Sequence, residues 1–147
     1  MKPGISKWNS RRKYFVVIVS LLIFTAFSCA RKVTFLTSSV VPAARGYVKV
    51  KKDNNSNYLI NVELTDLAEV SRLQPSRNNY VVWMETNDQI TKNIGQIKSS
   101  SGMFSSKLKA SFETVSSSKP SKIFITAEDD ADRQYPGNQL VLSTDKF

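Results

Sequence analysis

The residues best suited to chemistry in this 147-residue chain form an acidic cluster near its C-terminal end. Carboxylate oxygens are the ligands that calcium prefers, so the cluster is a candidate cation site or a loop that binds a partner. The alternative, which we favour, is a solvated loop that leaves a strand ending near Glu128, because acidic side chains are seldom buried. The cluster consists of Glu128, Asp129, Asp130 and Asp132.

A second acidic segment imitates the opening of a calcium-binding loop. Asp53, Asn55 and Asn57 stand at the first, third and fifth positions of such a loop. The pattern then fails, because Tyr58 replaces the glycine of the sixth position and Leu64 replaces the glutamate of the twelfth. We therefore expect this segment to be a hairpin loop of the kind that Asp and Asn side chains favour.

Histidine is absent from the sequence, and Cys29 is its only cysteine. The absence of histidine removes the commonest general base, the usual zinc ligand and every Ser-His or Cys-His pair. A Ser-Lys dyad is conceivable among the many serines and lysines, but no spacing marks one. We expect no enzymatic activity and no cofactor. Without a second cysteine no intramolecular disulfide forms, so stability must come from packing.

Cys29 ends a segment that has the features of an export signal. Residues 1–13 contain five cations and no acid, and residues 14–27 are almost wholly apolar. These are the n-region and h-region of a secretory signal. The segment from Ala26 to Ala30 resembles a relaxed bacterial lipobox, in which small residues precede a cysteine that is lipidated, although Ala26 stands where leucine is usual.

Two alternatives to lipidation stay open. A membrane-spanning helix needs about 20 apolar residues, and 17 uncharged residues separate Lys13 from Arg31. Cleavage by an ordinary signal peptidase would leave a free thiol. Lipidation explains both the position and the solitude of Cys29, so we assign residues 1–28 to a lipoprotein signal peptide or anchor helix, 29–44 to a tether and 45–147 to a folded domain.

The net charge of +9 overstates how basic the folded part is. Five of the 21 cations precede Cys29 and all 12 acids follow it, which leaves 16 cations against 12 acids, or +4. A mildly basic exported domain needs no nucleic-acid partner. Lys49, Lys51 and Lys52 are expected on a solvated strand face, with contact to acidic lipid headgroups as the alternative. We expect the membrane and an envelope protein as partners, at the periplasmic or outer face of a bacterial membrane.

Short strands separated by turn-forming residues follow Ala44. Apolar and polar residues alternate between Tyr58 and Thr65, as in a half-buried strand. The strand around Trp83 is continuously apolar, as expected of a central strand covered on both sides. Tyr80 and Trp83 are therefore expected in the core rather than in a ligand groove. The expected strands cover residues 47–51, 58–65, 80–84, 93–98, 122–128 and 139–143.

Two segments are ambiguous. Residues 33–36 could pair as an edge strand within the tether. Residues 104–115 fit both helical and strand periodicity, and we favour a strand to about Ala110 followed by a short helical turn. The segment from Tyr135 to Gly137 is expected to be a turn, with a binding role as the alternative. Seven or eight strands at this spacing predict an all-β fold, a β-sandwich.

The second half of the chain contains five short motifs: residues 80–85 (YVVWME), 93–97 (NIGQI), 124–128 (FITAE), 136–137 (PG) and 140–143 (LVLS). In order and spacing they resemble the extracytoplasmic C-terminal domain of anti-sigma-K factors. The resemblance covers roughly residues 80–143. It implies an immunoglobulin-like sandwich with Trp83 in its core. It also implies that this domain lies outside the cytoplasm. Only residues 1–13 precede the apolar segment, so sigma-factor binding is not carried over. The expected function is a non-enzymatic envelope lipoprotein; a small-ligand or glycan module and a membrane-tethered regulator are the alternatives.

Overall fold

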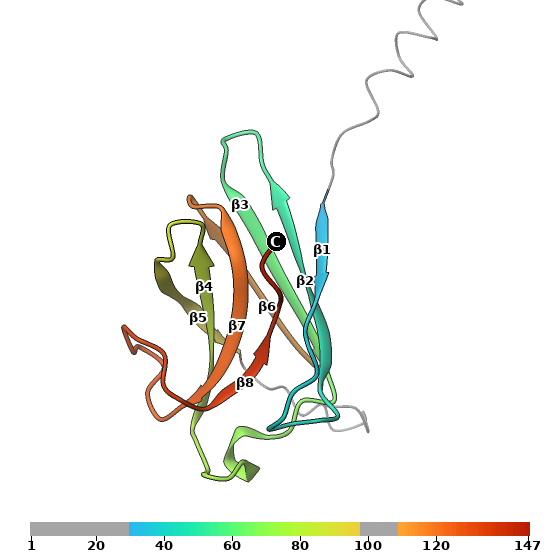
Figure 1. Cartoon of the computed structure of the whole chain (residues 1–147), viewed down its shortest axis with the longest axis vertical. Coiled ribbons are helices and arrows are strands. Elements are labelled where there is room, and N and C mark those ends of the chain that lie inside the picture. The colour runs from blue at the N-terminus through green and yellow to red at the C-terminus, as the bar shows by residue number, and fades with distance from the viewer. Residues whose placement is uncertain (1–29, 98–108) are drawn as a thin grey trace, which may run out of the picture.

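The chain is all-β in its described part. The computed structural model describes residues 30–97 and 109–147, so the predicted signal segment and Cys29 lie outside the described residues. Two antiparallel four-stranded sheets, ordered β1-β2-β3-β6 and β5-β4-β7-β8, face each other (Figure 1). This arrangement is consistent with the predicted β-sandwich. The strands are β1 (Arg31–Thr34), β2 (Arg45–Lys52), β3 (Tyr58–Thr65), β4 (Asn79–Thr86), β5 (Thr91–Ile97), β6 (Lys109–Ser116), β7 (Pro120–Glu128) and β8 (Leu140–Ser143).

The core lies between the two sheets and is built from every second residue of the strands. Successive side chains of a strand point to opposite faces, so one face of each sheet can be apolar throughout. In β4 the inward residues are Tyr80, Val82 and Met84, which belong to one hydrophobic cluster with residues of both sheets. The other strands contribute Val48, Val50, Ile60, Val62, Leu64, Ile97, Ala110, Ile123, Ile125, Ala127, Val141 and Leu142.

The ambiguous segment proves to be a strand where a helical turn was expected. Residues from Lys109 to Ser116 form β6, which pairs with β3 without interruption from Tyr58↔Ser116 to Thr65↔Lys109. The helical turn after Ala110 was therefore a wrong prediction. The apolar spacing that suggested a helix depends partly on residues 104–108, which lie outside the described part of the chain. A short 3-10 helix, Val70–Arg72, is the helical element of the described residues.

Residues 31–44, assigned to a tether with an edge-strand alternative, contribute to the folded domain. β1 pairs with β2 from Arg31↔Val50 to Thr34↔Tyr47. The chain then crosses to the second sheet, where the Leu36 amide donates to the Ser143 carbonyl at 2.8 Å. Val41 and Ala44 are buried. The helices of the described residues include none with the length and apolarity needed to cross a membrane.

The antiparallel register gives the domain two distinct ends (Figure 1). We call the end where β1 begins the proximal end; it carries the β2–β3 hairpin loop, residues 53–57, and the chain end after β8. We call the opposite end the distal end; it carries the two long loops, residues 66–78 and 129–139. The first loop leads into β4 and the second leaves β7. Because β4 and β7 pair with each other, the two loops lie at the same end of one strand pair.

Candidate functional site

The first member of the acidic cluster, Glu128, is a buried structural residue. Its side chain is only 2% exposed. Oε1 accepts hydrogen bonds from Thr126 Oγ1 at 2.6 Å and from the Gly137 amide at 2.7 Å. Oε2 accepts one from Arg133 at 3.1 Å. A buried carboxylate is costly unless it is hydrogen-bonded and paired. Glu128 meets that requirement through one donor on β7, Thr126, and two in the 129–139 loop, Arg133 and Gly137.

The other three acids of the cluster do not converge on one site. Asp129 pairs with Arg77 at 2.5 Å, which joins the two distal loops. Asp130 accepts the backbone amide of Asp132 at 3.0 Å. The described residues contain no group of three or more acidic or cysteine side chains placed to hold a metal ion. Glu128, Asp129 and Asp130 therefore serve as the framework of the 129–139 loop, to which Asp132 contributes its backbone amide.

The two aromatic residues of β4 are buried as predicted, but on opposite faces of the sheet. Tyr80 belongs to the inter-sheet core, and its hydroxyl donates to the Ala68 carbonyl at 2.9 Å. Burial raises the pKa of Tyr80 to about 12. Trp83 has no exposed surface, yet it lies outside the inter-sheet cluster and stacks on Phe124, with ring centroids 6.3 Å apart. Trp83 is therefore a buried residue as expected, but it packs on the outer face of the second sheet and not between the two sheets.

The 129–139 loop folds back over the outer face of the second sheet. Asn93 of β5 donates through Nδ2 to the carbonyls of Ala131 and Arg133, at 2.8 and 3.0 Å. At Gly137 a Cβ atom would lie 2.6 Å from Glu128 Oε2, so only glycine fits against the carboxylate. Tyr135 at the loop tip is 76% exposed. The contacts of Asn93, Gly137 and Glu128 therefore fix a loop on which the Tyr135 side chain is exposed.

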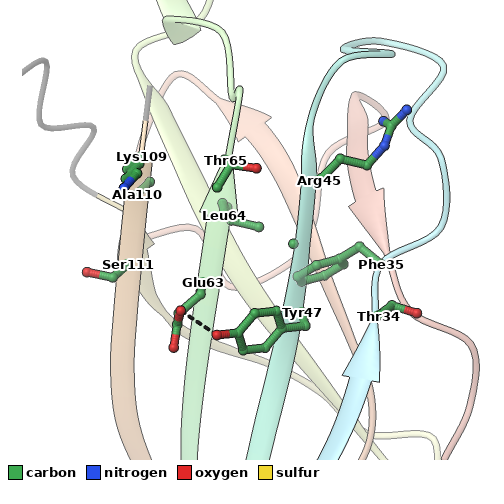
Figure 2. Close-up of a pocket in the computed structure, with 11 residues that line it drawn as sticks. Thr34, Phe35, Arg45, Tyr47, Glu63, Leu64, Thr65, Lys109, Ala110 and Ser111 are labelled. Atoms are coloured by element: carbon green, nitrogen blue, oxygen red, sulfur yellow. Dashed lines mark hydrogen bonds between the residues drawn. The ribbon is translucent and has the colours of Figure 1, made fainter. Parts of the chain in front are cut away.

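A second candidate site, which was not predicted, is a hollow of about 650 Å³ on the first sheet. Figure 2 shows Phe35 and Tyr47 beside each other at its centre, with Glu63 and Ser111 on the adjacent strands. Arg45 turns away toward its own turn, where it donates to the carbonyls of Pro42 and Ala44. The hollow is lined by Thr34, Phe35, Arg45, Gly46, Tyr47, Glu63, Leu64, Thr65, Lys109, Ala110 and Ser111.

Tyr47 is the centre of a cluster of charged groups beside the hollow. It pairs with Glu63 across β2 and β3, and its hydroxyl donates to the Glu63 carboxylate (Figure 2). Lys49 lies 3.4 Å from that carboxylate. The ammonium groups of Lys32 and Lys49 lie 3.8 and 5.0 Å from the centre of the Tyr47 ring. The pairing of Tyr47 with Glu63 could have been predicted from the sequence, because a hairpin closed by residues 53–57 brings these two residues opposite each other.

These contacts shift the pKa values of Tyr47, Lys49 and Glu63. Each shift favours the form present at neutral pH, which is a neutral tyrosine, a charged lysine and a charged glutamate. The hydrogen bond to Tyr47 lowers the pKa of Glu63, and Lys49 lowers it further. The hydrogen bond to Glu63 raises the pKa of Tyr47. The hydrogen bond to Tyr47 raises the pKa of Lys49. A general acid or base needs a pKa near the working pH, so this cluster is suited to binding and not to proton transfer.

Comparisons with protein-family models, curated proteins and solved structures find no match to the chain.

Proposed function

We propose that the protein is a non-enzymatic, membrane-anchored envelope lipoprotein that presents a β-sandwich to a protein partner on the outer side of a bacterial membrane. The observation that carries the proposal is the place where the folded domain begins. β1 starts at Arg31, two residues after Cys29. An extended chain spans at most about 3.6 Å per residue, so a lipid on Cys29 would hold the sandwich within about 7 Å of its attachment point.

The distal end is the part of the domain that such an anchor would leave free. Its two loops are joined by the Arg77–Asp129 ion pair and by hydrogen bonds from Arg77 to Gln139 and from Gln139 to the Pro75 carbonyl. Loops fixed on a rigid scaffold are common recognition surfaces. The exposed ring of Tyr135 lies in this joined pair of loops, and we assign the partner contact to it.

The assignment to a non-enzymatic class rests on the chemistry of the side chains. The sequence has no histidine. The exposed cluster around Tyr47 has shifted pKa values that hold its groups away from proton transfer at neutral pH. Catalytic groups are normally tuned in the opposite direction.

The strand order supports an immunoglobulin-like form of the sandwich. In that fold one sheet has the order A-B-E and the other contains C, F and G, with C′ added beside C in some members. β2, β3 and β6 follow the first pattern, and β5-β4-β7-β8 follows the order C′-C-F-G. β1 adds an edge strand to the first sheet. This topology is what the resemblance to anti-sigma-K C-terminal domains implies.

Metabolic labelling with palmitate in a bacterial host tests the proposal. We expect label in the wild type, none in Cys29→Ser, and unchanged label in Ser28→Ala, which keeps a small residue before the cysteine. Retention of label in Cys29→Ser, or loss of label in Ser28→Ala alone, would contradict lipidation at Cys29.

A photo-crosslinking residue tests the partner surface in the same strain. Placed at Tyr135, it should give a discrete crosslinked envelope protein. Placed at Val115, which is 61% exposed on the first sheet, it should not. Crosslinks from Val115 alone would move the partner surface to the first sheet.

A small-ligand or glycan module is the second candidate, favoured by the hollow beside Phe35 and Tyr47. An aromatic ring next to hydroxyl and carboxylate groups is a suitable surface for a sugar, since the ring stacks and the polar groups fix its orientation. The burial of Trp83 and Tyr80 removes them from that role. Calorimetric titration with envelope glycans should give heat that Tyr47→Ala abolishes and Tyr135→Ala leaves unchanged; no heat in the wild type would remove this candidate.

A further inference from the structure

The proximal end of the sandwich carries exposed cations around the start of β1. Arg31 and Lys32 begin β1, and Lys51 and Lys52 end β2. All four are exposed. Lys32 lies opposite Lys49 in the pairing of the two strands, which extends the cationic surface along the sheet.

Two of the acids at the proximal end are held by contacts within the domain. The Asp53 carboxylate accepts the backbone amides of Asn55 and Asn57, both at 2.8 Å. Glu85 pairs with Lys146 at 2.9 Å. Asp88 and Asp145 also lie at this end. The distal end carries more acids, namely Asp66, Glu69 and the cluster from Glu128 to Asp132, but Arg72, Arg77 and Arg133 pair with three of them. Among the described residues, cations therefore outnumber acids at the proximal end, whereas the two are close to balance at the distal end.

The register of β1 and β2 places the hairpin at the level of the expected anchor. Arg31 pairs with Val50, so β2 continues past it through Lys51 and Lys52 before the hairpin loop begins. Two strand residues rise about 7 Å, which equals the greatest span from Arg31 back to Cys29. If Cys29 lies at the membrane surface, the hairpin reaches that surface too.

We propose that the proximal end rests on acidic lipid headgroups, with Lys51, Lys52 and the hairpin loop as the main contact. This inference depends on the proposed anchoring at or near Cys29. A negative leaflet attracts cations within about one Debye length, which is about 8 Å at physiological ionic strength. The hairpin loop has one acid, Asp53, whose carboxylate is held by the backbone amides of Asn55 and Asn57. The rest of the loop consists of Asn and Ser side chains, which suit a headgroup layer. The contact would hold the distal loops away from the membrane.

Hydrogen exchange of the full membrane-bound protein tests the contact. The protein is reconstituted into vesicles of phosphatidylcholine alone or of equal parts phosphatidylcholine and phosphatidylglycerol, and exchange of residues 53–57 is compared. We expect exchange to slow by about fivefold or more on the acidic vesicles, the effect of one cation near such a surface, and to recover near 1 M salt, where the Debye length is about 3 Å.

Two charge reversals provide the matched comparison. Lys51→Glu should remove most of the protection on acidic vesicles. Arg72→Glu, the same change of charge at an exposed distal position, should leave it intact. Equal exchange on both vesicle types, or equal effects of the two variants, would overturn the headgroup contact.

Vesicle flotation at high salt distinguishes this failure from a failure of anchoring. Protein that floats with both vesicle types but shows no acidic-lipid protection keeps its anchor and loses the proposed contact. Protein that floats with neither overturns the anchoring on which the inference depends.

Discussion

Trp83 donates a 2.7 Å hydrogen bond from its indole nitrogen to Thr126 Oγ1, on the face of β4 that points away from the inter-sheet core. Thr126 in turn donates to Glu128, which accepts the Gly137 amide. The outer face of the second sheet therefore has its own buried layer, in which an indole, a hydroxyl and a carboxylate form one continuous chain of hydrogen bonds beneath the 129–139 loop.

Truncation of Trp83 should destabilise the domain strongly. Trp83→Ala removes a fully buried indole, and such a change costs about 3 to 5 kcal/mol of the free energy of unfolding. Trp83→Phe keeps an aromatic ring against Phe124 but leaves Thr126 without its donor, so a smaller loss of about 1 to 3 kcal/mol is expected. Urea unfolding measures both. Equal losses for the two variants would show that the hydrogen bond dominates over packing.

Replacement of Glu128 should loosen the loop that it holds. In Glu128→Gln the side-chain oxygen can still accept hydrogen bonds from Thr126 and the Gly137 amide. The nitrogen that replaces Oε2 cannot accept from Arg133, so the charged pair is lost. We expect a loss of about 1 to 3 kcal/mol and faster hydrogen exchange in residues 129–139.

Asp130→Asn is the matched control for Glu128→Gln. Asp130 is exposed and accepts one local amide, so its replacement should change stability by about 0.5 kcal/mol or less. If the two variants behave alike, Glu128 does not fix the loop.

Local periodicity predicted the parts of this fold that depend on strand and turn alone. Apolar and polar residues alternate over residues 58–65, and these are the bounds of β3. The hairpin loop that precedes β3 lies where its Asp and Asn residues predicted a loop. β6 escaped prediction because its Val115 is exposed while Phe112 is partly buried, so its apolar residues do not mark one face. Pairing with β3 decided its structure, and pairing between distant segments is not a local signal.

The candidate site was harder to predict, for the same physical reason. The acidic cluster was visible in the sequence, but Glu128 is buried only because a loop from the same cluster folds back over Trp83 and Thr126. The hollow beside Tyr47 requires β1, β2, β3 and β6 to lie side by side. Both sites are created by tertiary contacts between residues that are each unremarkable in their own segments.

Removal of the Tyr47 hydroxyl should return the Glu63 pKa toward its ordinary value. The hydroxyl is the main cause of the lowered pKa, so Tyr47→Phe should raise it, while Lys49→Gln should raise it less. Carboxyl chemical shifts of Glu63, followed by NMR during an acid titration, measure the change. An unchanged Glu63 midpoint in Tyr47→Phe would contradict the hydrogen bond.

The same pair predicts a pH window for its contribution to stability. Because the folded pKa of Glu63 lies below its ordinary value of 4.5, its contribution is present above that value and is lost as the pH falls through the folded pKa. The folded pKa of Tyr47 lies above 10.0, so its contribution is present below that value and is lost as the pH rises through the folded pKa. Tyr47→Phe should therefore flatten the acid limb of the stability profile relative to the wild type.

Gly95 should not tolerate a side chain, because it lies where β5 approaches β6. A Cβ atom on Gly95 would lie 2.7 Å from Cε2 of the Phe112 ring, and the backbone φ of +137° is itself unfavourable for other residues. We expect Gly95→Ala to cost about 1 to 3 kcal/mol, whereas Ala at the exposed neighbour Gln96 should change stability little. Phe112→Leu in the Gly95→Ala background separates the two causes. If the ring is the main obstacle, the double variant loses less than the sum of the single losses; strictly additive losses in urea unfolding would assign the cost to the backbone and contradict the steric contact.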